Sequence, residues 1–257
     1  MSIMANAPAS LPQPGDISPQ EWAVRRDLAA CYRLAALHGW VDSIATHISA
    51  RVPGEESFLL NPYGMLFEEV TASNLVKIDL QGNILRPSEY AINPAGFVVH
   101  SAVHAVRHDA GCVMHLHTDD GVAVSCLSEG LMPLNQTAMV IASHIAYHDY
   151  EGVALDLDEC ERLGRDLGQR NLMILRNHGT LTVGATVGEA FLRMYLLERA
   201  CTIQIRALST GRPLQPVTPE ALQRTAEVGD ALGGPVAAHA WSAHKRLLDR
   251  QTTDYLH

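Results

Sequence analysis

The chain has 257 residues, 47% of them hydrophobic, so it is long enough to bury a substantial core. Its 28 acidic side chains outnumber its 19 basic ones, and the net charge of -9 disfavours nucleic acid or an anionic membrane as a main partner. No apolar run approaches the roughly 20 residues that a membrane-spanning helix requires.

The two ends of the chain differ in composition from its middle. Residues 1–17 are expected to form a disordered arm, because residues 1–15 are rich in Ala, Pro and Ser and lack the basic flank and apolar centre of a secretory signal. Residues 18–257 are expected to form a single domain, with 211–257 as a C-terminal helical extension. The five cysteines are scattered without C-x-x-C spacing, which is typical of reduced core residues in a cytoplasmic protein.

The first third of the chain predicts one helix followed by three strands. Ser18 and Pro19 form a typical helix start, and Gly39 is expected to end the helix. Apolar and polar residues then alternate over 46–52 and 76–80, and the short apolar run 58–60 lies between these two segments.

A second helix is expected to begin at Asn93-Pro94 and to run to about residue 109. His100, His104 and His108 recur within it at every fourth position and therefore share one helical face. Such spacing can bind zinc, but no glutamate stands beside His100 to complete the familiar metalloprotease motif. The series favours a polar helix face, with His100 bordering a site.

The central motif lies at residues 111–120. Residues 112–117 alternate with the period of a strand, so His115 and His117 point the same way with Cβ atoms roughly 7 Å apart. That spacing suits two ligands of one cation, although a pair of satisfied core histidines is the alternative. A third histidine, His178, follows the apolar strand predicted at 172–175. We infer a site of three histidines with an open position for water or substrate.

The remaining elements complete the expected fold. A short helix is expected from Thr118 to Gly130, an irregular stretch over 131–156, and helices over 158–170 and from Thr186 to Leu208. A polar C-terminal helix broken near Gly233 follows a proline-rich linker. Strands and helices interleave too irregularly for a barrel of eight units. The order favours an α/β fold, a three-layer α/β/α sandwich.

The sequence resembles the class II aldolase/adducin domain family over most of residues 20–210. The segments that carry the resemblance, taken in order, are 39–40, 46–49, 61–64, 70–73, 93–102, 113–118, 146–150 and 175–179. The resemblance implies an α/β/α fold around a largely antiparallel sheet. It also implies one divalent metal per chain, usually Zn with Mn or Fe as alternatives, held by His115, His117 and His178. Family members are commonly homotetramers with the site near a subunit interface.

The chain departs from the sugar-phosphate aldolases of this family on the substrate side of the site. Those enzymes carry a Ser-Ser-Glu segment whose Glu is an acid/base, whereas the aligned stretch here is Pro94-Ala95-Gly96. His47 stands where they place an Asn. In both places the chain resembles the adducin-like bacterial branch more closely. The expected substrate pocket includes Asn61, Gly64, Gly96 and Asn177.

Three neutral imidazoles leave a divalent cation its full charge and a free position, so that it can stabilise an enolate in retro-aldol cleavage or β-keto decarboxylation. A proton donor is also required. The candidates are His148 and Tyr147, followed by His47, His100 and Glu89, each of which can instead serve as a structural hydrogen-bonding group.

We therefore expect a divalent-metal-dependent lyase that acts on a small oxo or hydroxy compound lacking phosphate. The first alternative is a catalytically silent, adducin-like assembly or binding domain that retains a metal site. The second is a mononuclear iron oxygenase, from whose usual ligand set three histidines without a carboxylate depart.

Overall fold

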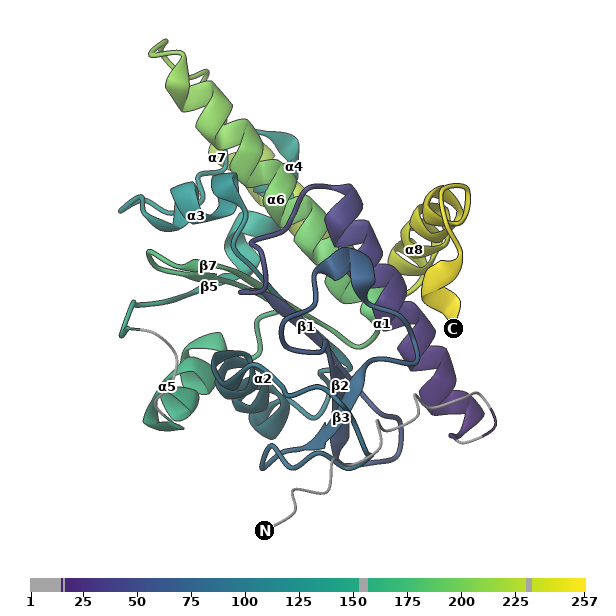
Figure 1. Ribbon diagram of the computed structural model, residues 1–257. Helices are drawn as coiled ribbons and strands as arrows, with labels where there is room; N and C mark the ends of the chain where they lie inside the picture. The colour runs from purple at the N-terminus through teal and green to yellow at the C-terminus, as the bar shows by residue number, and fades with distance from the viewer. Residues whose placement is uncertain (1–14, 16, 153–156, 230–232) are drawn as a thin grey trace.

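A seven-stranded sheet lies between two layers of helices in the computed structural model, which describes residues 15, 17–152, 157–229 and 233–257 (Figure 1). The expectation of a three-layer α/β/α fold is confirmed. The expected N-terminal arm lies almost wholly outside the described residues. No helix of the described ranges is both long and apolar enough to cross a bilayer.

The sheet has the strand order β3-β2-β1-β4-β7-β6-β5. Its strands are β1 (His47–Arg51), β2 (Ser57–Leu60), β3 (Val76–Asp79), β4 (Cys112–Leu116), β5 (Ile145–His148), β6 (Leu172–Leu175) and β7 (Gly179–Gly184). All neighbours are antiparallel except β5 and β6, so the sheet is largely antiparallel, as expected. In the centre, His115 of β4 is opposite His47 of β1 and Leu181 of β7.

The helices are α1 (Pro19–Leu37), α2 (Pro94–Val106), α3 (Asp119–Ser125), α4 (Gln136–Ile141), α5 (Leu157–Leu167), α6 (Val187–Ser209), α7 (Pro219–Gly229) and α8 (Gly234–Asp249). The described residues also form the short 3-10 turns η2 (Phe67–Glu69), η3 (Ala142–His144) and η4 (Asp254–Leu256). The predicted caps are present. The Ser18 side chain accepts from Glu21 N, and Gly39, with φ of 72°, follows the end of α1 in the left-handed conformation.

Each face of the sheet has its own apolar core. Helices α1 and α6 cover one face, where Leu28 and Phe191 pack with Met114 of β4, and α8 packs against these two helices. Helices α2 and α5 cover the other face, where Val103 packs with Val113 of the same strand (Figure 1). Because side chains alternate along a strand, His115 lies on the α2/α5 face with Val113. This alternation decides on which side of the sheet the candidate site is built.

Two expectations of local structure were wrong. The described part of residues 131–156 is not irregular, because it contains α4, η3 and β5. Strand β5 has four residues at the edge of the sheet and pairs with β6 more than twenty residues later, so local periodicity carries no signal for it. The second wrong expectation is that all five cysteines are core residues. Cys31, Cys112 and Cys201 are buried, but Cys126 is exposed and Cys160 is half-buried.

Candidate metal centre

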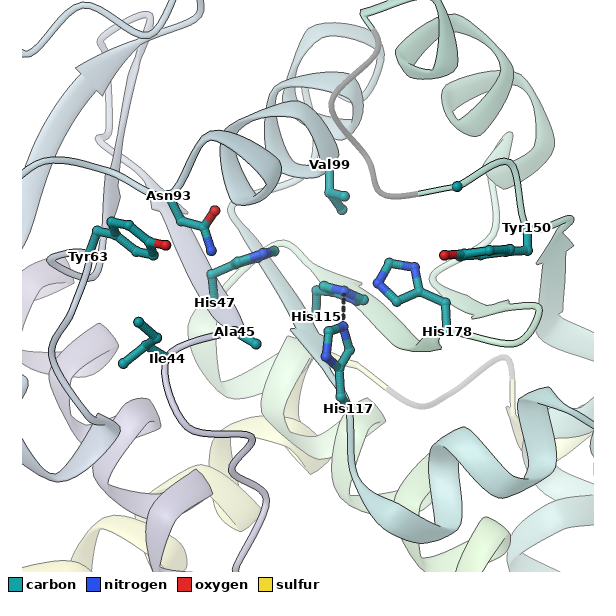
Figure 2. Close-up of a pocket in the computed structure, with 11 residues that line it drawn as sticks. Ile44, Ala45, His47, Tyr63, Asn93, Val99, His115, His117, Tyr150 and His178 are labelled. Atoms are coloured by element: carbon teal, nitrogen blue, oxygen red, sulfur yellow. Dashed lines mark hydrogen bonds between the residues drawn. The ribbon is translucent and has the colours of Figure 1, made fainter.

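Three imidazoles converge at the end of β4. One ring nitrogen from each of His115, His117 and His178 lies within 4.8 Å of the others (Figure 2). The Nε2 atoms of His115 and His117 are 2.9 Å apart. The three residues that the sequence predicted as metal ligands are therefore brought together.

The pairing of β4 with β7 places the third imidazole beside the first two. His178 lies in the turn between β6 and β7, and Leu116 of β4 is opposite Thr180 of β7. Asn177 has a φ of 55°, a left-handed conformation that asparagine tolerates, and the His178 backbone N donates to Ser125 Oγ at 3.2 Å. These contacts fix the turn that carries His178.

The Nδ1 atoms of His115 and His117, on the far side of each ring from the shared contact, are hydrogen-bonded. His115 Nδ1 donates to the Thr180 carbonyl oxygen at 3.0 Å, and His117 Nδ1 donates to Asp42 Oδ2 at 3.0 Å. Imidazoles that bind metals commonly donate their second N–H to a carbonyl or carboxylate in this way. With their outer nitrogens donating, both rings direct an Nε2 lone pair toward the other, an arrangement that suits a shared cation.

Burial keeps two of the three rings, His115 and His178, neutral, which a metal ligand requires. Burial lowers the pKa of His115 well below its ordinary value, and the neighbouring His178 and His47 lower it further. Burial likewise lowers the pKa of His178 to about 4. The donor set and its protonation state therefore fit a divalent cation such as zinc.

A cavity of about 400 Å³ opens beside the three imidazoles. Among its described lining residues there is no Lys, Arg, Asp or Glu. Besides the three histidines, the cavity is lined by Ile44, Ala45, His47, Tyr63, Asn93, Val99, Tyr150 and Gly152 (Figure 2). Imidazoles, two phenols and one amide are thus the polar side-chain groups of the described lining.

His47 is the outer member of a buried hydrogen-bonded chain. Its Nδ1 lies 2.9 Å from His100 Nε2, and Ser49 Oγ bridges the other nitrogen of His100 to His104 Nε2. Burial lowers the pKa of His100 and of His104 to about 3, so both rings are neutral. The expectation of a polar helix face was wrong, because His100 and His104 are fully buried against the sheet and only His108 is exposed.

Gly96 lies directly against His47. A Cβ atom on Gly96 would be 2.6 Å from Cδ2 of His47, closer than side chains can approach. His47 therefore occupies the space that a side chain at position 96 would need. The histidine at position 47 therefore excludes a carboxylate side chain at position 96 unless its ring moves.

The other candidate acid/base residues lie outside this cavity. His148 Nδ1 donates to Asp166 Oδ2 at 2.8 Å, on the α5 side. The Tyr147 hydroxyl accepts from Leu131 N at 3.1 Å. Glu89 is exposed. None of these three side chains is among the described lining residues.

The predicted pocket residues lie around the cavity rather than in its wall. Asn61 is buried and accepts from the Tyr32 hydroxyl at 2.9 Å. Gly64 follows the lining residue Tyr63, and Asn177 precedes His178. Sequence reasoning did not single out Tyr63, Asn93 or Tyr150, although all three fall in segments that carried the family resemblance. It also missed Asp42, for which the sequence holds no signal, since the residue is 75 positions from His117.

Comparisons with known proteins identify a family that the chain resembles over most of its length. The family model described as Class II Aldolase and Adducin N-terminal domain matches residues 26–205. A Caulobacter vibrioides protein that carries the provisional name of a class 2 aldolase is 56% identical over 94% of this chain and 95% of that protein. The crystal structure of an aldolase II superfamily protein from Pseudomonas syringae matches with a TM-score of 0.92 and 51% identity, covering 95% and 98% of the two chains. Alpha-adducin of Mus musculus is 42% identical over 89% of this chain but only 33% of adducin.

Proposed function

Because the chain belongs to the class II aldolase and adducin family, we propose that it is a divalent-metal-dependent lyase of the aldolase or decarboxylase type. Its substrate is a small oxo or hydroxy compound without a phosphate group. The observation that carries the proposal is the convergence of His115, His117 and His178 beside a cavity of about 400 Å³.

The proposed resident metal is zinc, with manganese or iron as alternatives. A divalent cation on three neutral imidazoles supplies a Lewis acid that stabilises negative charge on an enolate oxygen. The protein holds its ligands in place through Asp42 and the Thr180 carbonyl, which bind the outer nitrogens of His117 and His115. We further propose a homotetramer or another homo-oligomer, as is common in this family.

His47 is the acid/base candidate that the cavity favours. Its ring lines the cavity, and its Nδ1 is held by His100, so its Nε2 is left for a substrate oxygen or carbon-bound proton. His100 acts only through His47, because it is fully buried. Tyr63, Asn93 and Tyr150 supply hydroxyl and amide groups that can orient a small substrate.

The lining of the cavity supports a substrate without phosphate. A phosphate dianion is usually met by arginine, lysine or a cluster of backbone N–H groups. The described lining residues include neither cation, and burial lowers the pKa of His47, His115 and His178 below the ordinary value, which disfavours their charged forms. Carbonyl and hydroxyl oxygens suit this surface better.

The test compares the metal content and activity of the parent protein, His117→Ala and the exposed control His108→Ala. We expect about one divalent metal per chain in the parent and the control, and loss of most of it in His117→Ala without loss of the oligomer. The same three proteins are then assayed for retro-aldol cleavage and decarboxylation of small hydroxy and oxo acids, with and without oxygen. Equal metal content in His117→Ala and its parent would overturn the site.

The same assays address the alternatives. A parent protein that binds metal and cleaves or decarboxylates nothing would favour the silent adducin-like domain. Oxygen-dependent turnover with bound iron would instead favour the oxygenase.

A further inference from the structure

Glu198 is a buried carboxylate near the middle of α6 that the proposed reaction does not use. Only 2% of its surface is exposed. Thr180 Oγ1 donates to its Oε1 at 2.7 Å, and Thr118 Oγ1 donates to its Oε2. One carboxylate thus binds two hydroxyls from two different strand ends.

Both threonines are next to the candidate metal ligands. Thr118 directly follows His117 at the end of β4, and Thr180 lies two residues after His178 at the start of β7. The Thr180 carbonyl oxygen also accepts from His115 Nδ1 at 3.0 Å. Thr180 therefore orients one ligand through its carbonyl while its hydroxyl reaches Glu198.

The surroundings of the carboxylate are closely fitted. Thr118 Oγ1 accepts from Gly121 N at 3.1 Å, which leaves its hydrogen for Glu198. A Cβ on Gly121 would lie 2.6 Å from Thr118 Oγ1 and 3.0 Å from Glu198 Oε1, so no larger residue fits there. Burial raises the pKa of Glu198 to about 7, against the two hydroxyl hydrogen bonds, which lower it. A carboxyl group buried at this cost needs a reason to be retained.

On the premise of the proposed metal site, we propose that Glu198 is a positioning residue for the metal centre. It ties the end of β4 to the start of β7 from the α6 side of the sheet. By holding Thr118 and Thr180, it fixes the separation between His115 and His117 on one segment and His178 on the other. Glu198 acts through the two threonines and does not itself bind the metal.

The test measures the affinity of the metal-free protein for Zn²⁺ alone, by competition with a chromogenic chelator. Glu198→Ala is expected to weaken zinc binding about 10- to 100-fold, as loss of outer partners of metal ligands does. Glu198→Gln is expected to restore most of the affinity. Its amide can accept from Thr118 and donate to Thr180, whose own hydroxyl hydrogen can turn to the Leu116 carbonyl oxygen at 3.4 Å.

Gln204→Ala is the matched control on the same helix. Gln204 is also fully buried, and its amide bonds Met132 N and the Gly130 carbonyl oxygen, away from the metal ligands. We expect this variant to lose stability in thermal unfolding but to keep the zinc affinity of the parent. An equal loss of zinc affinity in Gln204→Ala and Glu198→Ala would mean general destabilisation and would overturn the proposal.

A second pair of variants serves if Glu198→Ala does not fold. Thr180→Val removes a hydroxyl donor to Glu198, and Thr182→Val removes a hydroxyl two residues along β7 that donates to the Ala190 carbonyl oxygen instead. Weaker zinc binding in Thr180→Val alone supports the proposal, and equal affinities overturn it. A parent protein that binds no zinc overturns the proposed function and this inference together, whereas normal parent binding with an unaffected Thr180→Val overturns this inference only.

Discussion

The imidazole of His47 and the α-carbon of Gly96 are in contact so close that one methyl group could not be inserted between them. An added Cβ would be 2.6 Å from Cδ2 of His47. Gly96 lies in the first turn of α2, where alanine would otherwise favour the helix by about 1 kcal/mol. The position of the His47 ring therefore allows only glycine at position 96.

We predict that Gly96→Ala destabilises the protein by about 1–3 kcal/mol, the usual cost of overpacking, which exceeds the gain in helix propensity. In a His47→Ala background the same change is expected to be neutral or stabilising. Urea unfolding of the four proteins of this double-mutant cycle measures the coupling. The same cost for Gly96→Ala in both backgrounds would show that the contact does not exist.

Asp42→Ala is predicted to weaken zinc binding about tenfold, because His117 loses the carboxylate that orients its Nδ1–H. Asp42→Asn keeps an acceptor for that N–H and should lie between the alanine variant and the parent. Zinc competition titration measures all three. Asp27→Asn, at a comparably exposed aspartate paired with Lys245, should bind zinc like the parent. If Asp42→Ala does so too, the Asp42–His117 contact plays no part in metal binding.

Sugar phosphates such as fuculose or ribulose phosphate are predicted to be poor substrates. The described cavity lining holds no cation for a phosphate, and Gly96 places no carboxylate beside His47. Turnover is measured with coupled assays for the aldehyde product. A working sugar-phosphate aldolase is the positive control. Turnover comparable to that of the control enzyme would refute the argument from the lining.

Acid is predicted to destabilise the protein partly through His104. Burial lowers its folded-state pKa to about 3, below its ordinary 6.5. The unfolded chain therefore binds a proton that the folded chain does not, as pH falls from 6.5 toward 3. The contribution of His104 to stability is complete above pH 6.5 and falls by about 1.4 kcal/mol per pH unit within that window.

The unfolding free energy of His104→Gln should therefore fall less steeply between pH 6 and 4 than that of the parent. The two slopes against pH should differ by the equivalent of close to one bound proton. Urea unfolding over a pH series measures this slope. His108→Gln, at an exposed histidine on the next turn of the chain, should keep the slope of the parent. An unchanged slope in His104→Gln would mean that this ring is protonated in the folded state.

Much of the fold could be predicted from local patterns. The Ser18 and Thr186 caps, the alternation around His115 and the apolar run of β6 all depend on residues within a few positions of one another, and the structure confirms each. Strand β5 could not be predicted, because its partner is distant in sequence and its four residues are too few to show a period. The burial of His100 and His104 was missed for the same kind of reason, since Ser49, whose hydroxyl hydrogen-bonds to one nitrogen of each ring, is some fifty residues away.

The sequence by itself determined that His115 and His117 share one face of a strand, because side-chain direction in an extended chain follows from backbone geometry alone. Only the tertiary structure decided what surrounds them. The pairing of β4 with β7 brings His178 beside them, the loop after α1 brings Asp42 to His117, and α6 brings Glu198 beneath both strand ends. Such contacts arise from the packing of segments far apart in the chain, which leaves no trace in local periodicity.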